Sequence, residues 1–370
     1  MRLDELDYDL PAELIAQRPL VQRDASRLLV LDRGTGAVED RSFTEFPELL
    51  RGGELLVLNN ARVIPARLFG RRVGVHSQAP SNATRREHLT GNVEVLLTKQ
   101  VEAGIWEALV RPGRKLPVGE RVQFRDGAGE EGELEAEILS RGELGLRTLR
   151  FTSRTAETVE PLLDRLGHIP LPPYIERDDE SSDRDRYQTV FAKRRGAIAA
   201  PTAGLHFTPE IFERIRKRGV EICELTLDVG LGTFQPIHAE KIEEHAMHAE
   251  RFEISEETAE RIQKAREGKR PIVAIGTTVV RALEAAALRA VETDAKSLVM
   301  AGCGEARLFI SPGFQFRVVD ALLTNFHLPR STLLALICAF AGKDNVKAAY
   351  QHAVDARYRF YSYGDCMFIR

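Results

Sequence analysis

The hydrophobic pattern of the sequence changes twice, and this change constrains the possible folds more than any other feature. Between Arg71 and Phe151, short strand-like stretches alternate with turn residues, and apolar residues do not recur with a helical period. After this segment, helical and strand-like stretches alternate, which is typical of a sheet covered by helices. We therefore predict a barrel-like antiparallel β domain at 71–151. It would be inserted into one α/β domain, formed by 1–70 and 152–370, that has a mixed sheet with flanking helices.

Local signals predict several elements of the α/β domain. Thr208, Ser255 and Ser331 are typical helix N-caps, since each precedes a stretch with helical character. The apolar runs Leu28–Leu31 and Leu55–Leu58 predict strands, the first within a hairpin and the second buried. Because these strands come from the first 70 residues, we expect them to complete the sheet of the later α/β segment.

The charge balance excludes a uniformly basic nucleic-acid coat protein. The 370 residues carry 52 Lys and Arg against 55 Asp and Glu, which gives a net charge of −3. The segment from Arg62 to Arg125 nevertheless holds 12 basic and five acidic residues, and an acidic stretch follows it. Arg114 and Lys115 lie in the densest part of this segment. They are candidates for phosphate contacts, although such a cluster is also typical of a solvated surface.

Cysteine usage predicts a reduced, cytoplasmic protein. Four cysteines occur, none in a CxxC pair or near a histidine at zinc-ligand spacing. The N-terminus has no apolar targeting segment, and the longest apolar stretch, Leu333–Ala341, is too short to span a bilayer. His245 and His248 lie close together, but no HExxH pattern occurs and an arginine follows. We therefore predict neither a metal site nor a membrane segment.

The stretch Ile272–Thr278 is the clearest generic sign of a ligand site. A buried strand ends at Gly276 and leads into a helix that we expect a threonine to cap. Ligands bind at such positions because the amides of the helix N-terminus point into the crevice. A plain structural turn would give the same pattern. Arg281 and Glu284 lie one turn later and either face this crevice or belong to a solvated helix face.

Other polar residues stand next to apolar segments and are further candidates. His206 lies in an irregular loop and is either a general base or a structural histidine. Asp228 follows a strand and precedes two closely spaced glycines, which indicates a tight turn against a ligand or a capped turn. Asn325 and His327 lie between an apolar strand and a buried helix, where polar groups need backbone or ligand partners.

Several stretches together resemble one family, the S-adenosylmethionine:tRNA ribosyltransferase-isomerases of queuosine biosynthesis. They occur in the family's order over nearly the whole chain, and the inserted β segment resembles the family least. The stretches are Leu6–Pro11, Asn59–Leu68, Pro170–Ile175, Arg186–Phe191, Ala200–Thr208, Val229–Pro236, His245–Glu250, Gly276–Glu284, Pro312–Phe314, Val319–Leu334 and Tyr358–Asp365.

The resemblance implies an activity and its substrates. The enzyme would transfer the ribosyl unit of S-adenosylmethionine to 7-aminomethyl-7-deazaguanine at the wobble position of tRNA. It would isomerise that unit to an epoxycyclopentanediol, giving epoxyqueuosine and releasing adenine and methionine. S-adenosylmethionine is then a ribosyl-donating cosubstrate, tRNA is the partner, no metal is needed, and we expect a monomer.

The resemblance also implies roles for individual residues. The proton-transfer candidates are His206 and Asp228. The candidates for holding the cosubstrate are Thr202, Gly204, Gly230, Gly232, Thr277, Thr278, Arg281 and Glu284. The candidates for contacts with tRNA or its modified base are Arg62, Arg114, Lys115, Asn325, His327, Arg359 and Tyr361.

The chain departs from the family pattern at a few positions. Asp228 stands where the family has a histidine, and an aspartate with an ordinary pKa near four is a weaker base. Ala285 replaces a serine, and His76–Thr90 is an additional loop. Two other functions stay open: a methyltransferase, which the absence of a glycine-rich nucleotide loop disfavours, and a non-catalytic RNA-binding protein, which the net charge disfavours.

Overall fold

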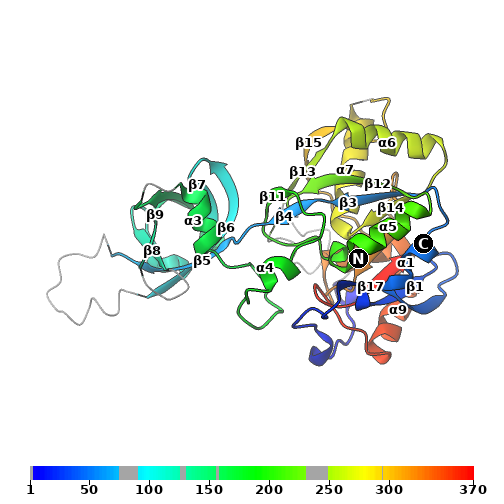
Figure 1. Ribbon diagram of the computed structural model, residues 1–370, viewed down its shortest axis with the longest axis horizontal. Helices are drawn as coiled ribbons and strands as arrows, with labels where there is room; N and C mark the ends of the chain where they lie inside the picture. The colour runs from blue at the N-terminus through cyan, green and yellow to red at the C-terminus, as the bar shows by residue number, and fades with distance from the viewer. Residues whose placement is uncertain (1–2, 75–90, 126–130, 156–157, 231–248, 294) are drawn as a thin grey trace. The chain divides into compact units, whose positions relative to one another are not determined.

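The computed structural model describes residues 3–74, 91–125, 131–155, 158–230, 249–293 and 295–370 (Figure 1). The chain forms two compact units. The larger unit comprises 1–62, 172–178 and 185–370, and the smaller one comprises 63–171 and 179–184. The predicted fold class, a mixed sheet with helices and a closed antiparallel barrel, is confirmed. The predicted domain boundaries at residues 71 and 151 stay a prediction.

A nine-stranded mixed sheet forms the centre of the larger unit in the described part of the chain. The strands β12, β3, β14 and β16 run parallel to one another. The order across the sheet is β15 (Gly302–Ala306), β13 (Glu250–Ile254), β12 (Glu221–Leu227), β3 (Leu55–Asn59), β14 (Ile272–Ile275), β16 (Ala321–Asn325), β17 (Cys366–Ile369), β1 (Arg27–Leu31) and β2 (Val38–Ser42). Strands from the first 62 residues therefore complete the sheet, and β1 with β2 forms the predicted hairpin.

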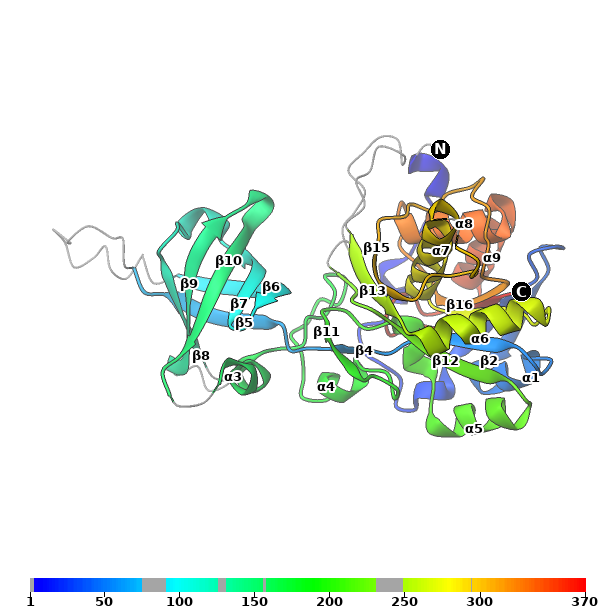
Figure 2. The ribbon, with the colours of Figure 1, turned by 90° about the horizontal axis from the view of Figure 1, so that it is seen from above.

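The central strands are apolar along their whole length because helices cover both of their faces. In β3, Leu55 and Val57 pack into one core cluster, while Leu56 and Leu58 pack into the other. Figure 2 shows α6 (Glu256–Glu267) and α7 (Thr277–Glu292) on one side of this sheet and α5 (Pro209–Lys217) on the other. The short helix α1 (Phe46–Leu49) joins α5 in the second cluster.

Side-chain caps define the starts of three helices, as the sequence predicts. Thr208 Oγ1 accepts a hydrogen bond from the Ile211 amide at α5, and Ser255 Oγ caps α6 in the same way. Ser331 Oγ accepts from the Leu334 amide and starts α8 (Thr332–Ala341), which is followed by α9 (Lys343–Asp355). The remaining helices and strands of the larger unit and its borders are α4 (Asp183–Arg186), β4 (Ala61–Val63) and β11 (Arg194–Ala197).

The smaller unit is a closed barrel with the helix α3 (Val159–Leu166) packed against β9 and β10. Sequence patterning predicts strand-like stretches between Arg71 and Phe151 but not β5, which begins four residues before the expected boundary at residue 71. The order around the barrel is β10 (Leu146–Ser153), β7 (Ile105–Arg111), β6 (Asn92–Glu102), β5 (Arg67–Arg72), β8 (Arg121–Arg125) and β9 (Glu131–Arg141).

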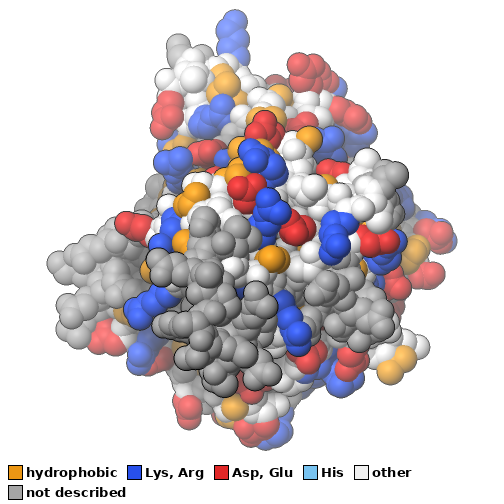
Figure 3. Space-filling model, turned by 90° about the vertical axis from the view of Figure 1, so that its left-hand side faces the viewer, with side chains coloured by type: hydrophobic (Ala, Val, Ile, Leu, Met, Phe, Trp, Pro, Cys, Tyr) orange, Lys and Arg blue, Asp and Glu red, His pale blue; other side chains and the backbone are white. Residues whose placement is uncertain are grey.

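Many basic side chains of the barrel pair with acids on neighbouring strands. Arg67 lies 3.2 Å from Glu94, and Arg121 lies 3.4 Å from Glu135. The face in Figure 3 accordingly shows Lys and Arg interspersed with Asp and Glu. The local excess of positive charge in the sequence therefore does not produce a uniformly basic surface on the described part of this face.

The structure also bears on the cysteines and on membrane insertion. All four cysteines are free thiols, and three of them are buried. Within the described residues, the helices are too short or too polar to cross a membrane.

Candidate functional site

A pocket lies at the carboxyl ends of the parallel strands β12, β14 and β16, where ligands bind in open α/β sheets. Its volume is about 670 Å³, including the part open to solvent. Segments far apart in the sequence line it: Tyr174, Ala200–Ala203, Val229, Gly276–Thr278, Thr324–Leu328, Ser331, Leu333, Tyr361 and Ser362.

Six of the predicted site residues meet in this pocket. Thr277 and Thr278 come from the start of α7, and Thr202 comes from the 3-10 helix η7 (Thr202–His206). Asn325 ends β16, His327 lies two residues later, and Tyr361 comes from the turn before β17. The sequence motifs therefore identify residues that the fold brings together, although they lie up to 159 positions apart along the chain.

The turn from β14 into α7 has the geometry of a ligand-binding turn. Gly276 has a φ of +98°, which side-chain-bearing residues rarely adopt. The Oγ1 atom of Thr278 is buried in the pocket wall and has no hydrogen-bond partner among the described residues. A buried hydroxyl without a partner is costly unless a ligand or water satisfies it. Thr278 therefore offers a directed contact to a polar ligand.

His327 lies in the pocket in its neutral form. Its Nε2 atom lies 2.9 Å from Thr324 Oγ1, and its backbone carbonyl accepts a hydrogen bond from Tyr8 Oη at 2.5 Å. Burial lowers the pKa of His327 to about 3. Neutral imidazole is thus the form present near pH 7.

Tyr361 and Ser362 form another wall of the pocket. The rings of Tyr361 and Tyr174 lie 4.6 Å apart between centroids, and Tyr174 Oη lies 2.6 Å from Ser362 Oγ. Tyr361 has a φ of +69°, a left-handed conformation that is unusual for a residue with a bulky side chain. The pocket thus presents two aromatic rings that tertiary contacts hold in place.

His206 lies behind this pocket rather than in it. Its Nδ1 atom lies 2.9 Å from Ser26 Oγ, and its Nε2 atom lies 3.3 Å from Asn325 Oδ1. The amide nitrogen of Asn325 donates to the Tyr361 carbonyl at 2.9 Å. Burial lowers the pKa of His206 to about 4, so that this neutral imidazole orients Asn325 through its Nε2–H group.

The described lining of the pocket contains no Asp, Glu, Lys or Arg side chain. His327 supplies the imidazole, and threonine, serine and tyrosine supply hydroxyl groups. Among the described residues, no three His, Cys, Asp or Glu gather as a metal site would require, and His245 and His248 lie outside the described residues. The described walls suit a ligand with hydroxyl groups and aromatic rings.

Arg281 and Glu284 are buried and bond to other parts of the protein. Arg281 Nη1 lies 2.6 Å from Glu250 Oε2, and Nη2 donates to the Ala306 carbonyl at 3.2 Å. The Glu284 carboxylate accepts backbone N–H groups from residues 317–319 at 2.9–3.1 Å. Neither lines the pocket, and neither lies on a solvated helix face.

Asp228 and two of the predicted glycines, Gly204 and Gly230, lie next to residues that line the pocket. Asp228 directly precedes the lining residue Val229, and burial raises the pKa of its carboxyl group, against the opposing effect of Arg251. Gly204 lies against the side chains of Phe191 and Thr189, where a Cβ atom would collide with both. Gly230 ends its described segment next to Val229, and Gly232 lies outside the described residues.

The predicted tRNA contacts lie in both units. Arg62 is exposed in the larger unit, and the side chain of Arg359 donates to the Arg18 carbonyl. Arg114 and Lys115 belong to the 3-10 helix η5 (Gly113–Lys115) of the barrel unit, where Arg114 is exposed.

Sequence reasoning missed Tyr174, Thr324 and Ser362 as lining residues. Tyr174 lies in a proline-rich stretch, and Ser362 lies among aromatic residues. No local spacing marks these residues, because only the fold brings them to the strand ends. Ser331 was recognised as a helix cap, and the structure shows that it lines the pocket as well.

Comparison with known proteins gives a full-length match. The family model described as "Queuosine biosynthesis protein" matches residues 3–369. A protein of Solibacter usitatus named S-adenosylmethionine:tRNA ribosyltransferase-isomerase is 53% identical over 373 residues, with all of both chains covered. A protein of Halothermothrix orenii with the same name is 46% identical over 369 residues, again with full coverage.

A solved structure is similar as well. The crystal structure of S-adenosylmethionine tRNA ribosyltransferase from Thermotoga maritima has 39% sequence identity and a TM-score of 0.52. The match covers 99% of this chain and 100% of that one.

Replacing Glu284 tests whether it stabilises the fold. Glu284→Ala would leave the buried amides of Val318 and Val319 unpaired, so we expect a loss of more than about 2 kcal/mol in the free energy of unfolding. Glu284→Gln keeps one acceptor oxygen and should lose less. Chemical denaturation measures both variants, and an Ala variant as stable as the original protein would contradict this role.

The neutral state of His206 predicts a pH dependence of stability. Because its pKa is about 4 in the folded protein, the unfolded chain binds more protons at pH 4–6.5. Stability should therefore fall as the pH falls from 7 to 5, by about 2 kcal/mol from this group. His206→Gln should lack this part of the loss. Equal pH slopes of the unfolding free energy in the two proteins would contradict a buried, neutral His206.

Proposed function

The chain belongs to the queuosine biosynthesis protein family, and we propose that it is an S-adenosylmethionine:tRNA ribosyltransferase-isomerase. It transfers the ribosyl unit of S-adenosylmethionine to 7-aminomethyl-7-deazaguanine at the wobble position of tRNA. It isomerises that unit and releases adenine and methionine. The observation that carries the proposal is the match over the whole chain with relatives 44–53% identical to it.

The pocket at the strand ends supports binding of the cosubstrate there. The hydroxyl groups of Thr202, Thr277 and Thr278 suit the ribose hydroxyls and the heteroatoms of adenine. The rings of Tyr174 and Tyr361 offer faces for stacking and for contact with the positively charged sulfonium. With no cationic side chain in its described lining, the pocket does not repel that charge.

The reaction requires removal of a proton from the carbon next to the sulfonium and an acid that assists the departure of adenine. His327 is a neutral imidazole in the pocket wall and is one candidate for hydrogen bonding to the reacting groups, but a pKa of about 3 makes it a weak base. Asp228 is a second candidate, because burial raises the pKa of its carboxyl group above the ordinary value and makes it a stronger base. We assign His206 a positioning role through Asn325, since its ring nitrogens contact Ser26 and Asn325.

Basic residues of both units are proposed to contact tRNA. Arg62 and Arg359 belong to the larger unit, and Arg114 and Lys115 belong to the barrel unit. Arg114 is exposed beside a surface hollow that Arg111, Arg141 and Arg147 also line, a composition that suits phosphate groups. The monomeric state and the cytoplasmic location stay predictions.

Product analysis tests the proposed function. With S-adenosylmethionine labelled in its ribosyl unit and tRNA carrying 7-aminomethyl-7-deazaguanine, we expect free adenine, free methionine and labelled tRNA. A methyltransferase would instead form S-adenosylhomocysteine. A non-catalytic RNA-binding protein would bind tRNA regardless of S-adenosylmethionine, with a steep salt dependence. Either result from a folded sample would contradict the proposal.

Thr278 tests the placement of the cosubstrate. Thr278→Val removes the unpartnered hydroxyl at nearly constant shape, so we expect the KM for S-adenosylmethionine to rise about tenfold. The free energy of unfolding should not fall, because no hydrogen bond within the described protein is lost. Thr278→Ser keeps a hydroxyl and serves as the matched control. An unchanged KM in the Val variant would place the cosubstrate elsewhere.

A further inference from the structure

A second, smaller cavity lies on the other side of His206. It has a volume of about 270 Å³, including its open mouth. Ser362 lines both cavities, Asn325 lines the first, and His206 lines the second. The contact between His206 and Asn325 therefore forms part of the wall between them. The second cavity is lined by Pro19, Leu20, Gln22, Arg23, Ser26, Arg186, Leu205, His206, Ser362, Tyr363 and Gly364.

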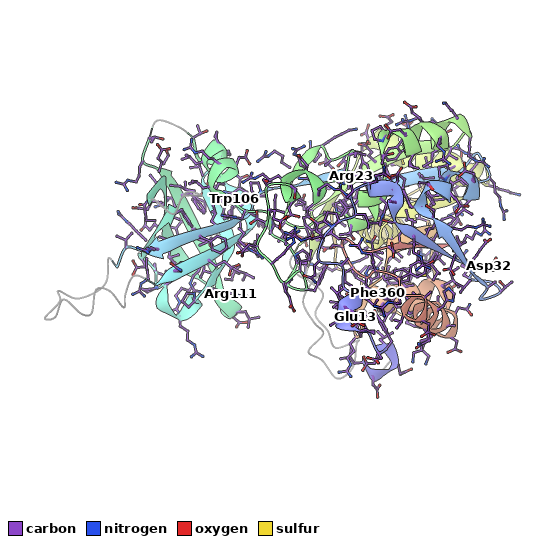
Figure 4. All side chains as sticks on the ribbon, turned by 60° about the horizontal axis from the view of Figure 1, so that its bottom comes forward. Glu13, Arg23, Asp32, Trp106, Arg111 and Phe360 are labelled. Carbon is purple, nitrogen blue, oxygen red and sulfur yellow. The ribbon has the colours of Figure 1, made fainter. Side chains whose placement is uncertain are left out.

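Two arginines give this cavity a positive character. Arg23, labelled in Figure 4 on the N-terminal segment, donates to the Leu205 carbonyl at 3.4 Å and to the Asp185 carbonyl at 2.5 Å. Arg186 donates to the Leu20 and Val21 carbonyls at 2.6 and 2.7 Å. Backbone carbonyls thus orient both guanidinium groups but neutralise neither charge.

Among the described residues, the positive charge around this cavity has no acidic counterpart in ion-pair contact. In the described part of the chain, no carboxylate lies within 4 Å of Arg23, Arg186 or Arg359. The buried Nε of Arg186 and the buried Nη1 of Arg359 lack hydrogen-bond partners there. Burial and the neighbouring Arg186 lower the pKa of Arg23, while Asp185 acts in the opposite direction. Like charges held together in this way are stabilised by a bound anion.

We propose that Arg23 and Arg186 form an oxyanion-binding site in this second cavity, with Arg359 adding to the positive potential, and that the ligand is a phosphodiester of the substrate tRNA. This proposal rests on the proposed function, because that function supplies the tRNA. Guanidinium groups bind phosphate oxygens through paired N–H donors, and Ser26 adds a hydroxyl group to the same cavity.

The position of the cavity favours a phosphate next to the modified nucleotide. The two cavities share Ser362, so a nucleotide whose base reaches the first pocket has its backbone phosphates within a short distance. The carboxylate of the methionine moiety has the same chemistry, and kinetics separates the two sources. A phosphodiester ligand affects the KM for tRNA, whereas a carboxylate ligand affects the KM for S-adenosylmethionine.

The test compares Arg23→Gln with Arg23→Lys and with Arg51→Gln, which removes an exposed cation elsewhere on the larger unit. For a phosphodiester, Arg23→Gln should raise the KM for tRNA about tenfold and leave kcat nearly unchanged. It should also reduce the slope of log affinity for tRNA against log salt by about 0.7–0.9. Arg23→Lys should recover part of the affinity, and Arg51→Gln should change neither quantity.

A methylphosphonate scan of the anticodon loop identifies the phosphate. One neutral linkage should weaken binding to the original protein and have no further effect on Arg23→Gln. A rise in the KM for S-adenosylmethionine alone would support the oxyanion site and assign it to the carboxylate. If Arg23→Gln behaves like Arg51→Gln in every measurement while the original protein turns over, the site is disproved and the proposed function stands. If the original protein yields no product, the proposed function itself fails.

Discussion

The side chain of Asn325 is the contact on which the arrangement of the site depends. Its carbonyl oxygen faces His206, and its amide nitrogen donates to the Tyr361 carbonyl. Both ends are buried, so that an amide turned the other way would leave polar groups unpaired at a cost of about 1–3 kcal/mol each. One side chain thus joins the end of β16 to η7 and to the C-terminal turn. It also separates the aromatic pocket from the arginine-lined cavity.

Charged side chains near the site form hydrogen bonds with the backbone and with each other, and they do not line the described pocket walls. Glu284 binds three successive amides before β16, and Asp365 accepts the amides of Arg27 and Arg359. Arg281 joins α7 to β13 and β15 through Glu250 and the Ala306 carbonyl. These contacts anchor segments that carry lining residues while leaving the described pocket walls neutral. Such walls suit a cosubstrate that brings its own positive charge.

Local sequence signals predicted the elements that local interactions stabilise. Ser255 and Ser331 cap their helices at the expected positions, and β14 leads through Gly276 into α7 as expected, but Gly276 rather than a threonine occupies the N-cap of α7. The strand β5 was missed because its register with β6 and β8, rather than its own composition, places it in the barrel. Elements that depend on a single strand or a single helix turn can therefore be predicted from the sequence. The pairing of strands that are far apart in the sequence cannot.

Only part of the candidate site could be predicted from the sequence. Thr277 and Thr278 follow one strand and Asn325 ends another, and parallel strands bring their carboxyl ends together at one edge. The directions in which the side chains of Arg281 and Glu284 point could not be predicted, because spacing along a helix does not show which buried partner each side chain contacts. His206 also follows a recognisable pattern, but only the fold shows that its two ring nitrogens face Ser26 and Asn325.

The conformation of Tyr361 shows how the fold stabilises an unfavourable backbone at the site. A left-handed φ at a tyrosine costs of order 1–3 kcal/mol and persists only where surrounding contacts determine it. The Tyr361 carbonyl accepts both the Asn325 side chain and the Gly364 amide at 3.0 Å, and its ring packs on Tyr174. Gly364 approaches the backbone of Arg359 and Phe360 so closely that a Cβ atom has no room there. The same turn presents Tyr361 to the first pocket and places Ser362, Tyr363 and Gly364 along the second. The strained residue, Tyr361, therefore lies in the one short segment that lines both cavities.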